Sequence, residues 1–272
     1  MNSAESDIPE TDESMVEELE PQGFIDRIIN IYLEPATLFK YLAVKPDFWT
    51  PWIVVGVLML VITTFTFPVT FDLGVERQIQ ILQQQGKSDA EIAKKAEQIE
   101  NLRTFSMVTA IVLSAIAPLI GWLISAGIIF LISLIQGLEA GFKRIFSVVA
   151  YTSMISILGS GVIDKIIKLA RGADTMDEWE RSIISLAVLL PANAHKALVT
   201  ILSIVDPFFI WALVVMAIGL TYVNKCRMRS AVVTIIIYVI IIFVLVAGLG
   251  FVQQYFTGGS SDGGGGHVVI SD

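Results

Sequence analysis

The chain has 272 residues, of which 54% are hydrophobic and only 16% are charged, and its mean hydropathy is +0.72. A soluble globular domain carries roughly 25% charged residues, whereas about 20 apolar residues at 1.5 Å each cross a hydrocarbon core of roughly 30 Å. These values exclude an ordinary soluble domain. They predict an all-α, polytopic membrane helix bundle with about five transmembrane helices, short interfacial helices and an extramembrane helical hairpin.

The segment before the first span is polar at its start and amphipathic afterwards. The first 26 residues hold nine acids and no lysine or arginine, so no secretory signal peptide is expected. Residues 1–23 are predicted to be a disordered acidic tail. Residues 24–50 place apolar side chains at helical spacing on both sides of Pro35. They predict one or two short helices, which either lie along the membrane face or pack on the bundle.

The first span is predicted at about residues 51–71. Trp49 and Trp52 lie at its start, where amphipathic rings favour the membrane interface. Pro68 is expected to mark the end of this span.

Residues 72–104 are polar and are predicted to form a helical hairpin outside the membrane. Gly86 separates its two halves. The stretch Ser88 to Glu91 reads SDAE, which is a capping box that opens a second helix.

The second span is unusually long. Residues 105–135 are apolar for 31 positions, about 46 Å as a helix, which exceeds one straight crossing. Because no turn chemistry divides the run, we expect one helix that is kinked or tilted near Pro118. Gly121 and Gly127 are expected to permit close helix packing.

The third predicted span covers residues 145–163 and ends at Asp164. Residues 182–205 then contain two nine-residue apolar pieces on either side of a polar interruption. Neither piece is long enough to span alone. We therefore expect two short interfacial helices, the second of which starts near Asn193.

The fourth span is predicted at 207–223, which is 17 residues or about 25 Å. Asp206 then precedes its first turn and caps the free amides, and Pro207 occupies the first helical position without losing a hydrogen bond. The alternative places Asp206 deeper, as a buried functional acid in a kinked helix, because acids inside membranes are costly. The sequence leaves both interpretations open.

The fifth span is predicted at 231–252, and residues 253–272 form a flexible, glycine-rich tail. Cys226, the one cysteine, excludes an internal disulfide and is expected on the surface of a basic turn.

The orientation follows from the short loops. If the N-terminus faces the cytoplasm, eight basic residues lie inside and ten lie outside. The total numbers of basic residues therefore do not decide the orientation. The two short turns, 136–144 and 224–230, are locally basic, and such turns favour the cytoplasmic side. We expect a multi-pass protein of the plasma (inner) membrane with its N-terminus in the cytoplasm and its C-terminus outside.

Enzymatic chemistry finds little support in the residues. Gly159-Ser160-Gly161 hints at a serine nucleophile, but His195 and His267 lie in a loop and in the tail, not within a span. The sequence shows no grouped metal ligands, no phosphate-binding glycine loop and no basic aromatic patch for nucleic acid. We expect no enzyme activity, no cofactor and no metal.

Three stretches of the chain, taken in this order, form a recognisable pattern: EPATLFKYLAVKPDFWTPWIVV, FKRIFSVVAYTSMISILG and LSIVDPFFIWALVVMAIGL. Together they resemble the bacterial branch of the Yip family, the Ypt/Rab-interacting-protein type. The most characteristic residues are Asp206, Pro207, Phe208, Trp211 and Gly219. The resemblance implies five spans, a cytoplasmic N-terminus and no catalytic residues.

In a bacterial chain the resemblance implies a membrane scaffold or an accessory factor for another membrane complex. The expected partners are therefore the lipid bilayer and another membrane protein. The alternative is a small-solute or ion transporter or channel that uses a polar site near Asp206, since broken helices bind ions in transporters.

Overall fold

The computed structural model describes residues 21–139, 141–191 and 194–258, and every regular element in these ranges is a helix. Within them, four continuous helices are long and apolar enough to cross a membrane: α3 (Trp49–Gln84), α5 (Arg103–Ile135), the run from α6 to α7 (Phe142–Arg171) and α11 (Met228–Gly258). The bent pair α9 (Lys196–Ile204) and α10 (Pro207–Val223) adds a fifth candidate. The predicted all-α membrane bundle is confirmed. The bulk of both expected tails, 1–20 and 259–272, lies outside the described residues.

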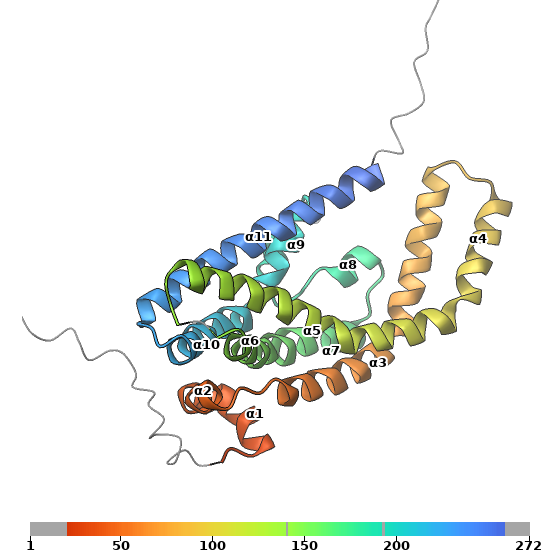
Figure 1. Cartoon of the computed structure of the whole chain (residues 1–272). Helices are drawn as coiled ribbons and strands as arrows, with labels where there is room; N and C mark the ends of the chain where they lie inside the picture. Colours follow the sequence, from red (N-terminus) through yellow and green to blue (C-terminus); the bar gives the residue numbers. More distant parts are fainter. Residues whose placement is uncertain (1–20, 140, 192–193, 259–272) are drawn as a thin grey trace, which may run out of the picture.

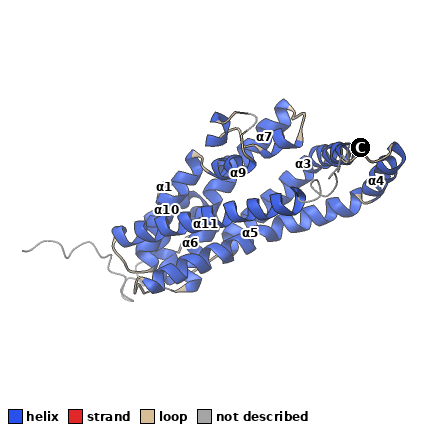
Figure 2. Cartoon of the chain, turned by 90° about the horizontal axis from the view of Figure 1, so that it is seen from above, coloured by secondary structure: helices blue, strands red, loops and turns tan. Residues whose placement is uncertain are grey.

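The helices α6 (Phe142–Ser156) and α10 form the centre of the bundle (Figures 1 and 2). α5 and α11 pack around them, and α3 lies along α5. In the most apolar part of each helix, 61% of the residues of the α6–α7 run are buried, against 22%, 22% and 17% for α3, α5 and α11. The outer helices therefore turn most of their side chains away from the protein, as lipid-facing helices do.

Two short helices precede the first span, α1 (Phe24–Leu33) and α2 (Pro35–Val44). α2 buries Leu38, Phe39 and Leu42 against α10 and α6. It is thus a helix that packs on the bundle, one of the two alternatives that the sequence left open. α2 and the α10–α11 turn lie at one end of the bundle, called the α2 end below (Figure 1).

The helix α3 does not end at Pro68, where the first span was expected to end. It runs for 36 residues from Trp49 to Gln84, with Pro68 inside it. Membrane helices tolerate proline in their interior. Just after Pro68, the Thr70 hydroxyl bonds back to its own helix, to the carbonyl oxygens of Thr66 and Phe67, each at 3.1 Å.

The last turns of α3 and the helix α4 (Asp89–Asn101) form the predicted hairpin at the opposite end of the bundle, called the hairpin end (Figure 1). The capping box is present: the Glu91 amide donates to Ser88 Oγ at 3.4 Å, and the Ser88 amide donates to Glu91 Oε2 at 3.1 Å. α5 then returns as one helix of 33 residues with Pro118 inside it. The Trp52 indole donates to the Ala115 carbonyl at 3.2 Å, close to this proline.

The third crossing also extends beyond its expected end. α6 passes through the π-helical turn η2 (Ile157–Gly161) into α7 (Val162–Arg171), so the helix does not stop at Asp164. Asp164 and Lys168 form an ion pair at 2.6 Å across one helical turn. Because the two charges neutralise each other, both residues fit within a continuous helix where an interruption was expected. The short helix α8 (Met176–Glu180) follows.

The segment 182–205 only partly matches its prediction of two short helices. Its first apolar piece forms just the 3-10 turn η3 (Leu186–Leu189), and its second forms α9. The Leu186 amide donates to the Val205 carbonyl at 2.9 Å and fastens η3 beside the end of α9. Asn193, the expected start of the second helix, lies outside the described residues.

Cys226 is buried, with 5% of its surface exposed, so its expected surface position is wrong. The preceding Lys225 has a left-handed φ of 45°, which reverses the chain after α10. This turn lets the Cys226 amide donate to the Thr221 carbonyl at 3.1 Å and places the thiol under the end of α10.

Candidate functional site

Asp206 lies at a break between two helices. α9 and α10 meet there at 59°, and Asp206 itself has an extended backbone. Its Oδ1 accepts a hydrogen bond from the Phe209 amide at 2.8 Å, and the residue is only 6% exposed. Asp206 is therefore the N-cap of α10, as one interpretation of the sequence predicted, and it is also buried. The functional role in the other interpretation stays a prediction. The positive end of α10 offsets the charge of Asp206.

Phe208 fits against the π-helical turn η2. A Cβ on Gly159 would lie 2.2 Å from Phe208 Cδ1, so only glycine leaves room for this ring. The hydroxyl of Ser160, next in the chain, donates to the Ser156 carbonyl at 2.9 Å. Gly159 thus serves a helix-to-helix contact, whereas Gly161 is exposed and a Cβ there would meet only the Ser156 carbonyl oxygen of its own helix, at 3.8 Å. Ser160 also bonds to its own helix.

Gly219 makes a second close contact further along α10. A Cβ there would lie 2.7 Å from Val148 Cγ1 and 3.1 Å from the Phe39 ring. Trp211, in contrast, has 42% of its surface exposed and does not join these contacts. The five residues singled out from the sequence therefore do not converge on one site. Three of them, Asp206, Phe208 and Gly219, fix how α10 begins and how it packs.

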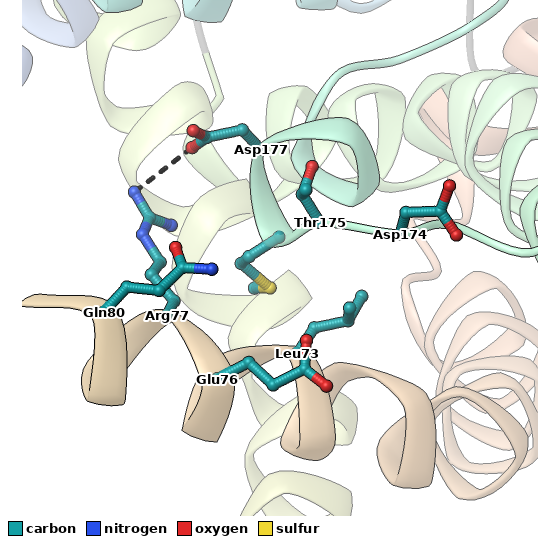
Figure 3. Close-up of a pocket in the computed structure, with 8 residues that line it drawn as sticks. Leu73, Glu76, Arg77, Gln80, Asp174, Thr175 and Asp177 are labelled. Atoms are coloured by element: carbon teal, nitrogen blue, oxygen red, sulfur yellow. Dashed lines mark ion pairs between the residues drawn. The ribbon is translucent and has the colours of Figure 1, made fainter. Parts of the chain in front are cut away.

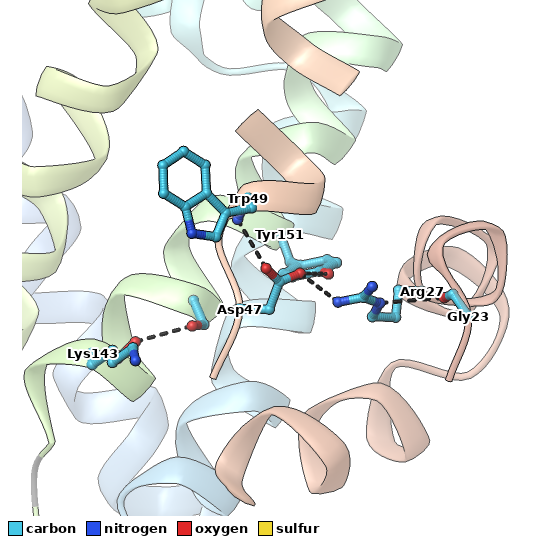
Figure 4. Close-up of polar contacts among 7 residues, drawn as sticks. Gly23, Arg27, Asp47, Trp49, Lys143 and Tyr151 are labelled. Atoms are coloured by element: carbon cyan, nitrogen blue, oxygen red, sulfur yellow. Dashed lines mark hydrogen bonds and ion pairs between the residues drawn. The ribbon is translucent and has the colours of Figure 1, made fainter. Parts of the chain in front are cut away.

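A polar cluster that the sequence did not predict lies near the start of α3 (Figure 4). Asp47 Oδ2 lies 2.6 Å from Arg27 Nη1 and accepts a hydrogen bond from the Tyr151 hydroxyl at 2.8 Å. Asp47 Oδ1 accepts from the Trp49 amide at 2.9 Å. These contacts, called the Asp47 cluster below, join α1, α3 and α6.

Electrostatics favour the charged form of Asp47. Burial by itself would raise the pKa of this carboxyl, but hydrogen bonds from Thr50, Tyr151 and the Trp49 amide, with the charge of Arg27, hold the pKa below its usual value. The sequence carried no local signal for this cluster, since Arg27 and Tyr151 lie 20 and 104 positions from Asp47.

A second polar cluster lies near the other end of the α6–α7 run. It consists of Asp164, Lys168 and the backbone groups that they contact, and it is called the Asp164 cluster below. Asp164 is 6% and Lys168 is 4% exposed. Asp164 Oδ1 accepts from the Ile183 amide at 2.8 Å, and Lys168 Nζ donates to the Trp179 carbonyl at 2.6 Å. The pair therefore binds the segment after α7 to the bundle. The four-residue spacing of Asp164 and Lys168 was a signal that sequence reasoning did not use.

A small pocket of about 110 Å³ lies between the extension of α3 and the start of α8 (Figure 3). It is lined by Leu73, Glu76, Arg77, Gln80, Asp174, Thr175, Met176 and Asp177. Arg77 pairs with Asp177 at 3.4 Å and with Glu180 at 3.0 Å, so the pocket wall holds α8 against α3. Among the described residues, no three or more His, Cys, Asp or Glu side chains are grouped as metal ligands would be.

Comparison with known proteins decides the family. The family model described as Yip1 domain matches residues 29–249, which is most of the chain. The chain belongs to the Yip1 family. It is similar to membrane protein YknW of Bacillus subtilis (strain 168), with 25% identity over 232 residues that cover 82% of this chain and 90% of the relative. No solved structure matches this Yip1-family chain significantly.

The family match confirms the resemblance inferred from the three sequence stretches, and it agrees with a membrane protein of several apolar helices. The matched region begins within α1 and ends within α11, so it includes the Asp164 cluster, the break at Asp206 and the Asp47 cluster apart from Arg27.

Proposed function

We propose that this Yip1-family protein is a non-enzymatic scaffold or accessory factor for another complex in the bacterial inner membrane. The observation that carries the proposal is the use of three acids that are buried or half-buried in the bundle. Asp47, Asp164 and Asp206 each bond to amides of their own chain, and the first two also bond to its cations. Acids with such contacts stabilise one arrangement of the helices. A bundle with one arrangement suits a protein that presents a binding surface to a partner.

The outward surface supports the same role. In the most apolar parts of α3, α5 and α11, about four residues in five are not buried by the chain itself. Such faces accept lipid, and they also accept the spans of another membrane protein through close van der Waals packing. We propose the lipid bilayer and a second membrane protein as the partners.

The proposed orientation places the α2 end in the cytoplasm. α3 starts near this end, whereas α11 runs from it toward the hairpin end (Figure 1). Lys143, Arg144 and Lys225 lie in or beside the short turns of the α2 end. Basic short loops favour the cytoplasmic side, which puts the N-terminus inside and the C-terminus outside.

The test is chemical crosslinking in the native membrane, followed by purification of the chain. A scaffold predicts that one membrane complex is enriched, and that this complex fails to assemble in cells that lack the chain. Recovery of the chain alone, together with normal assembly of every membrane complex in the deletion strain, would contradict the proposal.

A transporter or channel is the second candidate, and the break at Asp206 favours it. Half-helices that meet at an acid bind ions in several transporters. The Ser203 hydroxyl oxygen, three residues before Asp206, is buried and has no hydrogen-bond partner among the described residues. Transport predicts that the purified chain moves a solute into loaded vesicles and that Asp206→Asn abolishes this flux while the variant stays folded.

A further inference from the structure

The helix α1 has an apolar stripe that its own chain does not cover. Ile25, Ile29 and Leu33 lie four residues apart, on one side of the helix, and expose 66%, 46% and 75% of their surfaces. Ile31 on another side is fully buried. α1 is therefore apolar both toward the bundle and away from it.

A polar edge borders this stripe. Asp26 and Asn30 follow Ile25 and Ile29 directly, so helical geometry places them about 100° further around the helix. Arg27 then turns back toward Asp47. A helix with a core-facing side, an outer apolar side and a polar side fits a boundary between protein, lipid and water.

The stripe cannot turn inward, because two contacts hold α1 in place. Arg27 is joined to Asp47 at 2.6 Å. The Tyr32 hydroxyl donates to the Met154 carbonyl of α6 at 3.4 Å. Arg27 lies on the side of α1 opposite the stripe and Tyr32 on a side next to it, so the two contacts together set the rotation of α1 and leave the stripe facing outward.

The neighbouring helix α3 indicates what covers the stripe. α1 packs against α3, and α3 exposes Trp49, Ile53 and Val57 by 58%, 47% and 56%. These residues belong to a span whose outer side faces lipid, and tryptophan at a span end marks the headgroup level. α1 therefore packs on a span whose exposed side faces lipid and whose first turn carries an interfacial tryptophan.

We infer that α1 is embedded in the interfacial layer of the bilayer, with Ile25, Ile29 and Leu33 among the lipid chains and Asn30 toward water. This goes beyond the proposed scaffold role, since it assigns a lipid contact to a helix outside the five crossings. The Asp47 cluster then connects a helix held by lipid to the central helix α6.

Cys226 is the one native cysteine, so Cys226→Ala gives a background for single labels. A label on Ile29→Cys reports the environment of the stripe. A label on Asn30→Cys, one position further along the chain, is the matched control. Each variant carries an environment-sensitive fluorophore and is reconstituted, at high lipid-to-protein ratio, into vesicles of phosphatidylcholine and phosphatidylglycerol. The quenchers are a lipid with a shallow nitroxide and aqueous iodide.

We expect the shallow nitroxide to quench the label at position 29 about twofold more strongly than at position 30, and iodide to show the reverse order. Equal iodide quenching at both positions would overturn the inference, because the stripe would then face water. Protection of position 29 from both quenchers would also overturn it, because a second copy of the chain would then cover the stripe. Ile25→Cys repeats the test if Ile29→Cys does not fold.

Discussion

The glycines of the central helices and those of α5 look alike in sequence but have different structural roles. Gly159 lies where α10 meets η2, Gly219 lies where α10 meets α6 and α2, and any side chain at either position would overlap a neighbour. A Cβ on Gly121 or Gly127 of α5 would meet no neighbouring helix or side chain within 4 Å, although close packing was expected of both. A small residue in an apolar helix therefore indicates close approach only where another helix is present to approach it.

The same contrast holds for charges. The Asp164 cluster is buried between α7 and the segment after it, whereas Arg103, at the start of α5, forms ion pairs with Asp72 and Glu100 that remain open to solvent. Inner contacts should therefore dominate stability, and outer ones should contribute little.

The largest effect is expected from breaking the buried pair. Asp164→Asn leaves Lys168 without its counter-charge in a buried position, which should lower the free energy of unfolding by about 3–5 kcal/mol. Arg103→Met is the matched outer change and should leave stability unchanged within error. Thermal unfolding of both variants in the same detergent measures the difference. Equal losses would show that the inner and outer charges are equivalent.

The glycine contrast gives the next effect. Gly159→Ala forces a methyl group into the Phe208 ring and should cost about 1–3 kcal/mol, as overpacking does. Gly121→Ala should be neutral, because its Cβ meets open space. The double variant Gly159→Ala with Phe208→Ala should recover part of the loss, which a thermodynamic cycle measures. A loss that does not depend on Phe208 would refute the assigned contact.

A smaller effect is expected at the start of α10. Asp206→Ala removes the acceptor of the Phe209 amide and should lower stability by about 1 kcal/mol, whereas Asp206→Asn keeps a capping oxygen and should lower it less. The measurement is again the unfolding midpoint of the two variants. If Asn destabilises as much as Ala, the charge and not the cap is what α10 requires.

The smallest effect concerns pH. Because the pKa of Asp47 lies below its ordinary value of 3.8, this carboxylate stabilises the fold above that value, and the stabilisation is lost as pH falls below it. The wild-type midpoint should therefore drop, as pH falls below about 4, more steeply than that of Asp47→Asn. Parallel curves for the two proteins would place the acid sensitivity elsewhere in the molecule.

Local signals predicted much of this fold. Apolar length indicated the crossings, the Ser88–Glu91 capping box indicated the start of α4, and the Asp206-Pro207 pair indicated the start of α10. Each of these depends on residues that are close in sequence. Two effects specify these features: the helix length that a lipid bilayer requires, and the hydrogen bonding of the first helical turn. Both effects act between residues that are close in sequence.

Features that depend on distant partners were not predictable in this way. Pro68 and Asp164 looked like the ends of spans, but α3 continues through Pro68, and Asp164 pairs with Lys168 one turn further along the continuing helix. The Asp47 cluster and the fit of Phe208 against Gly159 join segments that are far apart in the chain. Only the folded arrangement shows that these groups meet.

The central claim is that the buried acids hold helices together while the protein supports another membrane complex. Asp206→Asn tests it most directly, because the substitution keeps a capping oxygen and removes the charge. In cells whose own copy is deleted, the variant should accumulate to wild-type levels and restore assembly of the crosslinked complex. A variant that is stable and abundant yet restores nothing would contradict the account and identify Asp206 as a functional acid.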